Sequence, residues 1–447
     1  MKKIGSIFMS LLVLFGASSA LASCGGSKKD DNTLVVWVSN PLKPDYESLL
    51  SMSGGNKNKM ALYTKAVVES FEAAHPGVTV RLESRGWSDS LNSQVMSAAR
   101  SNTLPDLMMG EMYLPVYIKE GILKPISIGE YEEKLSNGVI ADVKMGGKLY
   151  GAPFSTGVFA LQYNPEILEM AGIPEEDWEP ETWAELLVNS QKVAEANTNK
   201  GNIVTGGFLI NNVAGISGAF RALPFVRQAG GDFVNENGEI VFGSENAVEA
   251  YKFLSDLAKT APTGSLDITA EDQLHNLFIS GGAAYQLEGP WTLEEADDYF
   301  KACAIPKPTA ESTTSENAYV GNLIMAMTKN CDNEQLANEF IQHLLSPNMQ
   351  WELFMGDSRL PTNMTFLQEK YEEMIEEKPY FKAYLDIMLN DEFEGGLPTF
   401  QRNSARIWET WGTFYNDVLT TTNSASVTTL AQNFENTVKG LLEGLHE

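Results

Sequence analysis

Several side chains in this sequence could bind a polar solute, and Trp291 is the first of them. It stands after Glu288, Gly289 and Pro290, at the end of the apolar run 283–287. An aromatic ring offers a flat apolar face, while neighbouring polar side chains hydrogen-bond hydroxyl groups. This combination suits the C–H face and the hydroxyls of a sugar, so Trp291 is predicted to be a stacking surface.

Polar or aromatic side chains also follow three other apolar runs of strand length. The runs cover residues 34–38, 78–82 and 104–109, and the side chains after them are Ser39, Asn40, Trp87, Glu111 and Tyr113. Ligands of open α/β sheets gather at the carboxyl ends of the strands, so Glu111 and Tyr113 are predicted to face a cleft. For Ser39 and Asn40, a simple turn is the alternative.

The sequence around these candidates alternates between strand and helix patterns. Strand 34–38 is followed by helical spacing over residues 62–74 and by the alternating strand 78–82, which together make a parallel α/β unit. Thr182 and Glu185 form a capping box that begins another helix. The predicted fold class is therefore α/β.

The segment 147–163 contains two apolar runs that meet near Thr156. Pro153 cannot donate a ladder hydrogen bond inside a central strand, and Gly157 is conformationally permissive. The turn dipeptide Asn164-Pro165 then begins a helix. We interpret the junction at Thr156 and Gly157 as a hinge between two bodies.

These motifs resemble the extracellular solute-binding proteins of sugar ABC transporters, the family of the maltose-binding protein. The resemblance covers nearly all of the chain from residue 34 onwards. It implies a two-lobed periplasmic-binding-protein fold of type II, in which each lobe is a mixed sheet flanked by helices and the ligand lies beside the hinge crossings. The matching stretches are Gly-Lys-Leu-Tyr-Gly-x-Pro at 147–153, Leu-Gln-Tyr-Asn-Pro at 161–165, Gln-Ala-Gly-Gly-Asp at 228–232 and Phe-x-x-Gly-x-Ala-Ala…Gly-Pro-Trp at 278–291.

The resemblance implies a division of the chain into two lobes. Residues 33–155 and 324–362 would form the N-terminal lobe. Residues 156–323 and 363–447 would form the C-terminal lobe. Gly321 would be the pivot of the second crossing between the lobes.

The resemblance also adds site residues. The family's loop after the first strand borders the cleft, which favours a hydrogen-bonding role for Ser39 and Asn40. A tryptophan near Trp408 stacks on sugar in the maltose-binding protein, so Trp408 is a second stacking candidate. Because Trp408 and Trp411 lie three residues apart on one helix face, a core position for one or both is the alternative.

The expected function is that of the substrate-binding component of an ABC importer, which captures a mono- or oligosaccharide and delivers it to membrane permease subunits. The same scaffold carries other polar solutes in this family. A glycerol phosphodiester would require basic groups, for which Arg402 is the main candidate. A polyamine would require carboxylates around aromatic rings, which Glu111, Glu288 and Tyr113 could supply. A surface lipoprotein that binds or hydrolyses glycans is the third hypothesis.

Composition and motifs argue against several other functions. The formal net charge is −27 and no basic cluster occurs, which disfavours nucleic acid as a partner. Lys148 is followed by Leu149 rather than by the serine or threonine of a P-loop. The histidines show no zinc-ligand spacing, and no Gly-x-Ser-x-Gly elbow occurs. We expect a monomeric binding protein without cofactor or metal.

The first 32 residues are predicted to be export and anchoring signals. Residues 1–23 combine a basic start with an apolar stretch, as in secretory signal peptides. Leu21-Ala22-Ser23-Cys24 resembles a lipobox, so Cys24 is expected to be lipidated and residues 24–32 to form a flexible tether. The protein would be exported and lipid-anchored to the cell membrane, facing the periplasm or the exterior. Cys303 and Cys331 are interpreted as buried thiols, with a disulfide as the alternative.

Overall fold

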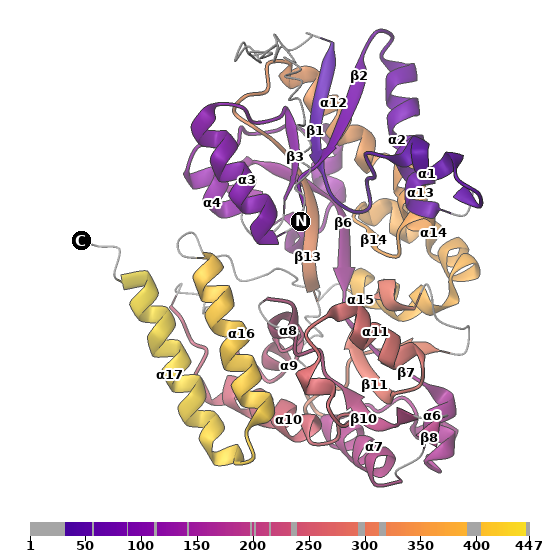
Figure 1. Ribbon diagram of the computed structural model, residues 1–447, viewed down its shortest axis with the longest axis vertical. Helices are drawn as coiled ribbons and strands as arrows, with labels where there is room; N and C mark the ends of the chain where they lie inside the picture. Colours follow the sequence, from indigo (N-terminus) through magenta and orange to yellow (C-terminus); the bar gives the residue numbers. More distant parts are fainter. Residues whose placement is uncertain are drawn as a thin grey trace, which may run out of the picture.

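Two α/β lobes lie one above the other along the long axis of the molecule and are joined by crossing strands (Figure 1). No helix in the described part of the chain has both the length and the apolar character that a membrane span requires. The computed structural model describes residues 32–55, 58–86, 88–110, 114–140, 143–196, 199–200, 203–213, 216–233, 239–293, 300–312, 319–390 and 404–443.

The first lobe is built on a six-stranded mixed sheet with the order β14-β6-β13-β3-β1-β2. Strand β1 is parallel to β2 and β3, and the pairs β13–β3, β13–β6 and β14–β6 are antiparallel. The strands are β1 (Thr33–Val38), β2 (Thr79–Ser84), β3 (Leu107–Gly110), β6 (Gly151–Val158), β13 (Tyr319–Met327) and β14 (Leu360–Pro361). The helices around it are α1 (Tyr46–Ser51), α2 (Lys59–Ala74), α3 (Ser88–Ser101), α4 (Leu114–Lys119), α5 (Asn137–Ile140), α12 (Glu334–Leu345) and α13 (Pro347–Gly356).

The second lobe is built on a four-stranded mixed sheet with the order β10-β11-β7-β12. Strands β10 and β11 are parallel, and β7 is antiparallel to β11 and β12. The strands are β7 (Ala160–Tyr163), β10 (Gly206–Leu209), β11 (Ala283–Glu288) and β12 (Lys301–Cys303). Two small antiparallel pairs lie outside both sheets, β4 (Lys144–Met145) with β5 (Lys148–Leu149) and β8 (Asn199–Lys200) with β9 (Ile203–Val204).

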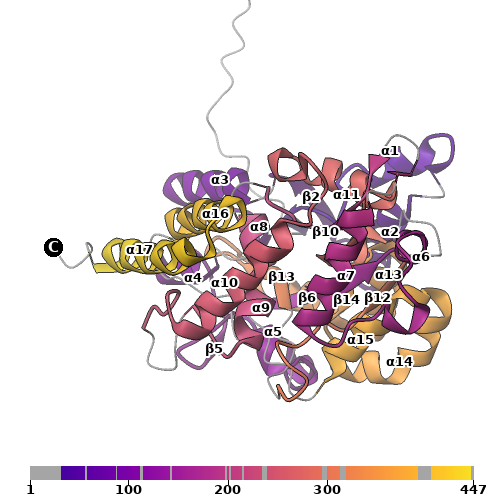
Figure 2. The ribbon, with the colours of Figure 1, turned by 90° about the horizontal axis from the view of Figure 1, so that it is seen from below.

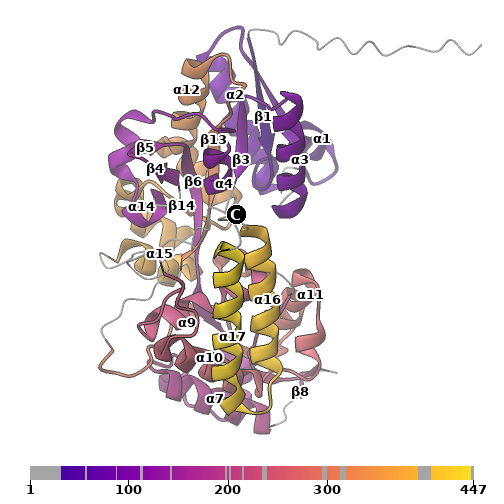
Figure 3. The ribbon, with the colours of Figure 1, turned by 90° about the vertical axis from the view of Figure 1, so that its left-hand side faces the viewer.

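Helices cover the second sheet and extend along its lobe. Figure 3 shows α16 and α17 side by side along the lobe, and Figure 2 shows α10 between this pair and α7. Helices α14 and α15 pack against each other on the other side of the lobe (Figure 2). The bounds are α6 (Pro165–Met170), α7 (Trp183–Ala196), α8 (Ile216–Phe220), α9 (Leu223–Gln228), α10 (Glu245–Ala258), α11 (Glu271–Ile279), α14 (Met364–Glu377), α15 (Lys382–Leu389), α16 (Ser404–Thr420) and α17 (Ser424–Glu443).

Local sequence signals account for where these elements begin and end. The predicted strands at 34–38 and 78–82 are the parallel pair β1 and β2, with helix α2 between them. The side chain of Asn58 caps α2 by accepting a hydrogen bond from the backbone N–H of Ala61 at 3.0 Å. Helix α1 lies between β1 and α2, and none of its residues is buried.

The crossing at 151–163 differs from its prediction in one respect. Strand β6 is continuous through Pro153 and Gly157, and the break before β7 comes at Phe159. Pro153 is tolerated because the register between β6 and β13 shifts next to it, between Leu323 and Ile324. A second shift, between Tyr319 and Asn322, lies opposite Gly157.

The two lobes have separate hydrophobic cores. One buried cluster joins the first sheet to its helices and contains Cys331, and another joins the second sheet to its helices and contains Cys303. Both cysteines are buried, and neither forms a disulfide in the described part of the chain, which confirms their interpretation as thiols. The core cluster of the second lobe also includes Phe354 and Leu360, which the predicted division at residue 362 assigns to the N-terminal lobe. The lobe boundaries themselves stay a prediction.

The capping box of α7 forms as predicted and offers a test of local stability. The N–H of Glu185 donates to Thr182 Oγ1 at 3.3 Å, and the N–H of Thr182 donates to Glu185 Oε2 at 3.1 Å. Replacing Thr182 with Ala should lower the free energy of unfolding by about 1 kcal/mol, because an orphan N–H at the helix start loses its acceptor. Urea denaturation measures the change. Thr437→Ala, at an exposed position inside α17, is the control and should have no destabilising effect.

Candidate functional site

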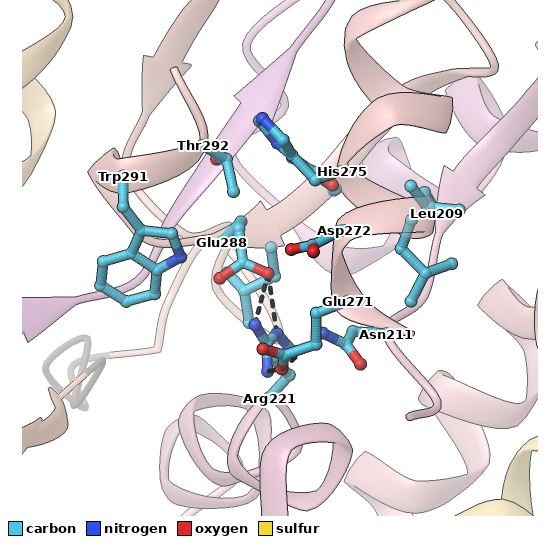
Figure 4. Close-up of a pocket in the computed structure, with 12 residues that line it drawn as sticks. Leu209, Asn211, Arg221, Glu271, Asp272, His275, Glu288, Trp291 and Thr292 are labelled. Carbon is cyan, nitrogen blue, oxygen red and sulfur yellow. Dashed lines mark hydrogen bonds and ion pairs between the residues drawn. The ribbon is translucent and has the colours of Figure 1, made fainter. Parts of the chain in front are cut away.

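A cavity of about 260 Å³ lies in the second lobe, beside the turn that follows β11 (Figure 4). Its walls come from the ends of β10 and β11, from the first two turns of α11 and from Arg221, which links α8 to α9. The turn Pro290–Thr292 closes one side and carries Trp291. Short elements from four parts of the chain therefore meet around one space.

A buried ion pair forms one wall of the cavity. Arg221 Nε donates to Glu288 Oε2 at 3.0 Å, and Arg221 Nη2 donates to the same oxygen. The second oxygen of Glu288 accepts the N–H of Gly289 at 3.0 Å. Arg221 is 8% exposed and Glu288 is 6% exposed, so both charges are largely removed from water. Burial raises the pKa of the Glu288 carboxyl above its usual value, and the Arg221 guanidinium opposes this rise.

A network of amides and hydroxyls fixes the floor of the cavity. Gln162 Oε1 accepts hydrogen bonds from Gln286 Nε2 at 2.7 Å and from Thr292 Oγ1 at 2.8 Å. Gln162 Nε2 donates to the carbonyl oxygen of Gly289 at 2.8 Å and to the hydroxyl of Tyr384 at 2.7 Å. These bonds join β7, β11, the 289–292 turn and α15 to one another. The polar groups of the cavity floor are therefore held rigidly.

The ring of Trp291 lies between the cavity and the crossing strands. A Cβ placed on Gly157 would come within 2.6 Å of Cζ3 of the ring, so the indole packs directly against the bare backbone of β6. The guanidinium carbon of Arg359, which precedes β14, lies 5.1 Å from the ring centroid. Arg359 is itself held by Asp357, with 3.5 Å between Nε and Oδ2. Trp291 therefore contacts two of the crossing segments.

The structure places some of the predicted site residues at this cavity and others elsewhere. Trp291 and Glu288 line it. Ser39 lies in the first lobe, where its N–H faces the sulfur of Met109 at 3.3 Å, and Asn40 is exposed and accepts a hydrogen bond from Lys43 Nζ at 2.6 Å. Their contact with a ligand stays a prediction. Four other candidates and the lipidation site lie outside the described residues, namely Trp87, Glu111, Tyr113, Arg402 and Cys24.

The structure places Trp408 in the core position that the sequence left open as the alternative to ligand stacking. Trp408 is 1% exposed, and its ring stacks on Trp411 with 4.9 Å between centroids and 14° between planes. Phe220 meets it edge-on at 5.1 Å. Trp411 packs against Phe233 and Phe242, so the face of α16 that bears both tryptophans belongs to the core of the lobe.

Arg221 is the main residue of the site that was not predicted from the sequence. It is the one charged residue in the otherwise apolar segment 216–226. A charge in such a segment is buried with it and needs a partner, which is a usable signal. Three other polar residues of the cavity lie in no motif that pointed to a binding site, and only the fold brings them together. They are Asn211, Glu271 and Asp272.

Comparisons with known proteins agree with this architecture. The family model for bacterial extracellular solute-binding proteins matches residues 66–383 of this chain. The maltodextrin-binding protein of Bacillus subtilis (strain 168) is 24% identical over 412 residues, which are 88% of this chain and 86% of that protein. An arabinooligosaccharide-binding protein of the same organism is 22% identical over 359 residues, 76% of each chain.

Solved structures of similar fold cover almost the whole chain. The cyclic α-maltosyl-1,6-maltose binding protein of Arthrobacter globiformis aligns with a TM-score of 0.72 at 19% identity, over 92% of this chain and 99% of that one. The GacH receptor of Streptomyces glaucescens aligns with a TM-score of 0.69 at 20% identity, over 92% and 98%. The two-lobed fold of type II is thereby confirmed. Because the family model spans most of the sequence, the chain belongs to the bacterial extracellular solute-binding proteins.

Proposed function

We propose that this protein is the substrate-binding component of an ABC importer and that it captures a carbohydrate beside the crossing strands. The cavity supports this proposal, because the ring of Trp291 and the polar side chains of Arg221, Gln286 and Glu288 line one space. A ring and fixed polar groups together can bind the C–H face and the hydroxyls of a sugar. The relatives include a maltodextrin-binding and an arabinooligosaccharide-binding protein.

The crossing strands would let a ligand change the angle between the lobes. Thr156 on β6 pairs with Asn322 on β13 and with Leu360 on β14, so all three crossing segments meet at one level. We assign the hinge to Thr156, Gly157 and Gly321, which lies in the irregular stretch of β13. Sugar bound in the second lobe would gain contacts from the first lobe on closure, which shifts the population to the closed form. Permease subunits would recognise that form.

The location of the protein is proposed from its first residues. Cleavage before Cys24 and acylation of that residue would leave a lipid-anchored, monomeric protein on the outer side of the cell membrane. Labelling with a radioactive fatty acid checks this proposal. The label should enter the native protein and be absent from Cys24→Ala.

Replacing Trp291 with Ala tests the carbohydrate proposal. We expect the affinity for the bound sugar to fall at least about tenfold, because the stacking surface is removed. Thermal shift against mono- and oligosaccharides, spermidine and a glycerol phosphodiester identifies the ligand, and isothermal titration calorimetry then measures the affinity of both proteins.

Trp178→Ala is the matched control for this substitution. Trp178 is a half-buried tryptophan of the same lobe, where its ring N–H donates to the carbonyl oxygen of Ile173 at 2.9 Å, and it does not line the cavity. Its loss should leave sugar affinity unchanged. Stabilisation by spermidine or the phosphodiester alone would refute the carbohydrate assignment, and equal affinities of Trp291→Ala and the native protein would refute the site.

A further inference from the structure

The lining of the cavity is acidic. Three carboxylates, from Glu271, Asp272 and Glu288, line it together with one guanidinium, that of Arg221. The guanidinium is already bonded to Glu288 and lies 3.8 Å from Glu271 Oε1. With its carboxylates ionised, this group carries two negative charges in excess. An anionic ligand would therefore meet a repulsive field at this site.

Gln286 adds a hydrogen-bond acceptor to the cavity lining, and the network determines the orientation of its amide. Gln162 donates from Nε2 to the carbonyl oxygen of Gly289, which can only accept, so Gln162 Oε1 must accept from Gln286 Nε2. Gln286 is 6% exposed and lines the cavity, and no donor in the described part of the chain bonds its Oε1. An acceptor that faces the cavity without a protein donor can accept a hydrogen bond from a ligand.

Asp272 provides a second acceptor group without a partner. It is the second residue of α11, and Figure 4 shows its carboxylate directed towards the middle of the cavity. Its carboxylate forms no ion pair or hydrogen bond with any side chain that the structure describes. The cavity thus presents acceptor oxygens from α11 and from β11, while its guanidinium is held by the ion pair.

We propose that the cavity binds an amino sugar, a saccharide with a protonated primary amine, whose ammonium group lies between Asp272 and Gln286. This assignment rests on the proposed carbohydrate function. A hydroxyl group both donates and accepts, whereas an ammonium group donates three hydrogen bonds and accepts none, so it matches oxygens that can only accept. Its charge also offsets the excess negative charge, and Trp291 is left to pack against the ring's C–H face.

Four sugars that share one ring test the proposal by isothermal titration calorimetry on the purified protein. They are glucosamine, glucose, N-acetylglucosamine and glucuronate, followed by the corresponding disaccharides. We expect the free amine to bind at least about tenfold more tightly than glucose or the acetylated sugar, and glucuronate to bind weakest. The preference for the amine should shrink at high salt, since it depends on charge.

Asp272→Asn locates the effect. It keeps the size of the side chain and removes its charge, so the preference for the amine over glucose should fall to within about twofold. Asp256→Asn is the control, because Asp256 is an acid of α10 that pairs with Lys259 at 2.6 Å and does not line the cavity.

The outcomes separate this proposal from the carbohydrate function. Equal or weaker binding of glucosamine relative to glucose would overturn the amino-sugar assignment and leave the carbohydrate function intact. An undiminished amine preference in Asp272→Asn would overturn the location. Binding of spermidine with no response to any sugar would refute the carbohydrate function itself.

Discussion

Replacing Arg221 with Met is expected to lower the free energy of unfolding by about 3–5 kcal/mol. The guanidinium is the ion-pair partner of Glu288, and both side chains are more than nine-tenths buried. Met fills much of the space of the arginine stem but cannot neutralise the carboxylate that remains. The loss therefore reflects an unpaired buried charge, and urea denaturation measures it.

Adding Glu288→Gln to Arg221→Met should recover much of this loss, because the double variant has no unpaired charge at this position. The pair of variants also separates charge from packing. If the double variant is as unstable as Arg221→Met, lost packing of the arginine is the cause, since its guanidinium carbon lies 5.2 Å from the ring centroid of Phe159.

The pH dependence of stability gives a second measure of the same interaction. Burial raises the pKa of Glu288 above 4.5 in the folded protein, so above that pH the folded state binds more protons at this group than the unfolded state does. The contribution of Glu288 to stability therefore falls as the pH rises from about 4.5 through the folded pKa. This fall should be larger in Arg221→Met, which lacks the opposing guanidinium, and should be absent when Glu288 is Gln.

Local patterns were sufficient to predict much of the fold. Three patterns depend only on neighbours within one element, and each has its predicted structure. They are the alternating run 78–82, the helical spacing over 62–74 and the capping box at Thr182. Pro153 shows where local rules fail, because the register shift that accommodates it is made by β13, far away in the sequence.

The candidate site was predictable only in part, for a similar reason. Trp291 follows a strand and a Gly-Pro turn, so its position could be inferred from residues beside it. Arg221 and Glu288 are 67 residues apart, and only the fold brings the segment between α8 and α9 beside the end of β11. Trp408 has the same residue type as Trp291, but the face of α16 that bears it is covered by α8. Residue type gave no means of telling a stacking ring from a core ring.

Replacing Gly157 with Val is expected to move the ring of Trp291 and to weaken sugar binding by at least about tenfold. Gly157 lies inside β6, where valine is favoured by strand propensity, so the backbone itself need not change. A Cβ there would lie 2.6 Å from Cζ3 of Trp291, which forces the indole away from the crossing strand and from Arg359. We expect a loss of about 1–3 kcal/mol in the free energy of unfolding and a shifted tryptophan emission spectrum.

A double-mutant cycle decides whether the ring is the cause. If the clash with Trp291 is responsible, Gly157→Val should cost little stability or affinity in a Trp291→Ala background, so the two effects are not additive. Gly440→Ala is the matched control, because Gly440 lies inside α17 with open space around its Cα, and alanine there should stabilise by about 0.5–1 kcal/mol. Additive losses in the cycle would show that Gly157 acts through the strand alone. If Gly157→Val has no effect once the indole is removed, the side chain of Trp291 alone connects the crossing strand to the binding cavity.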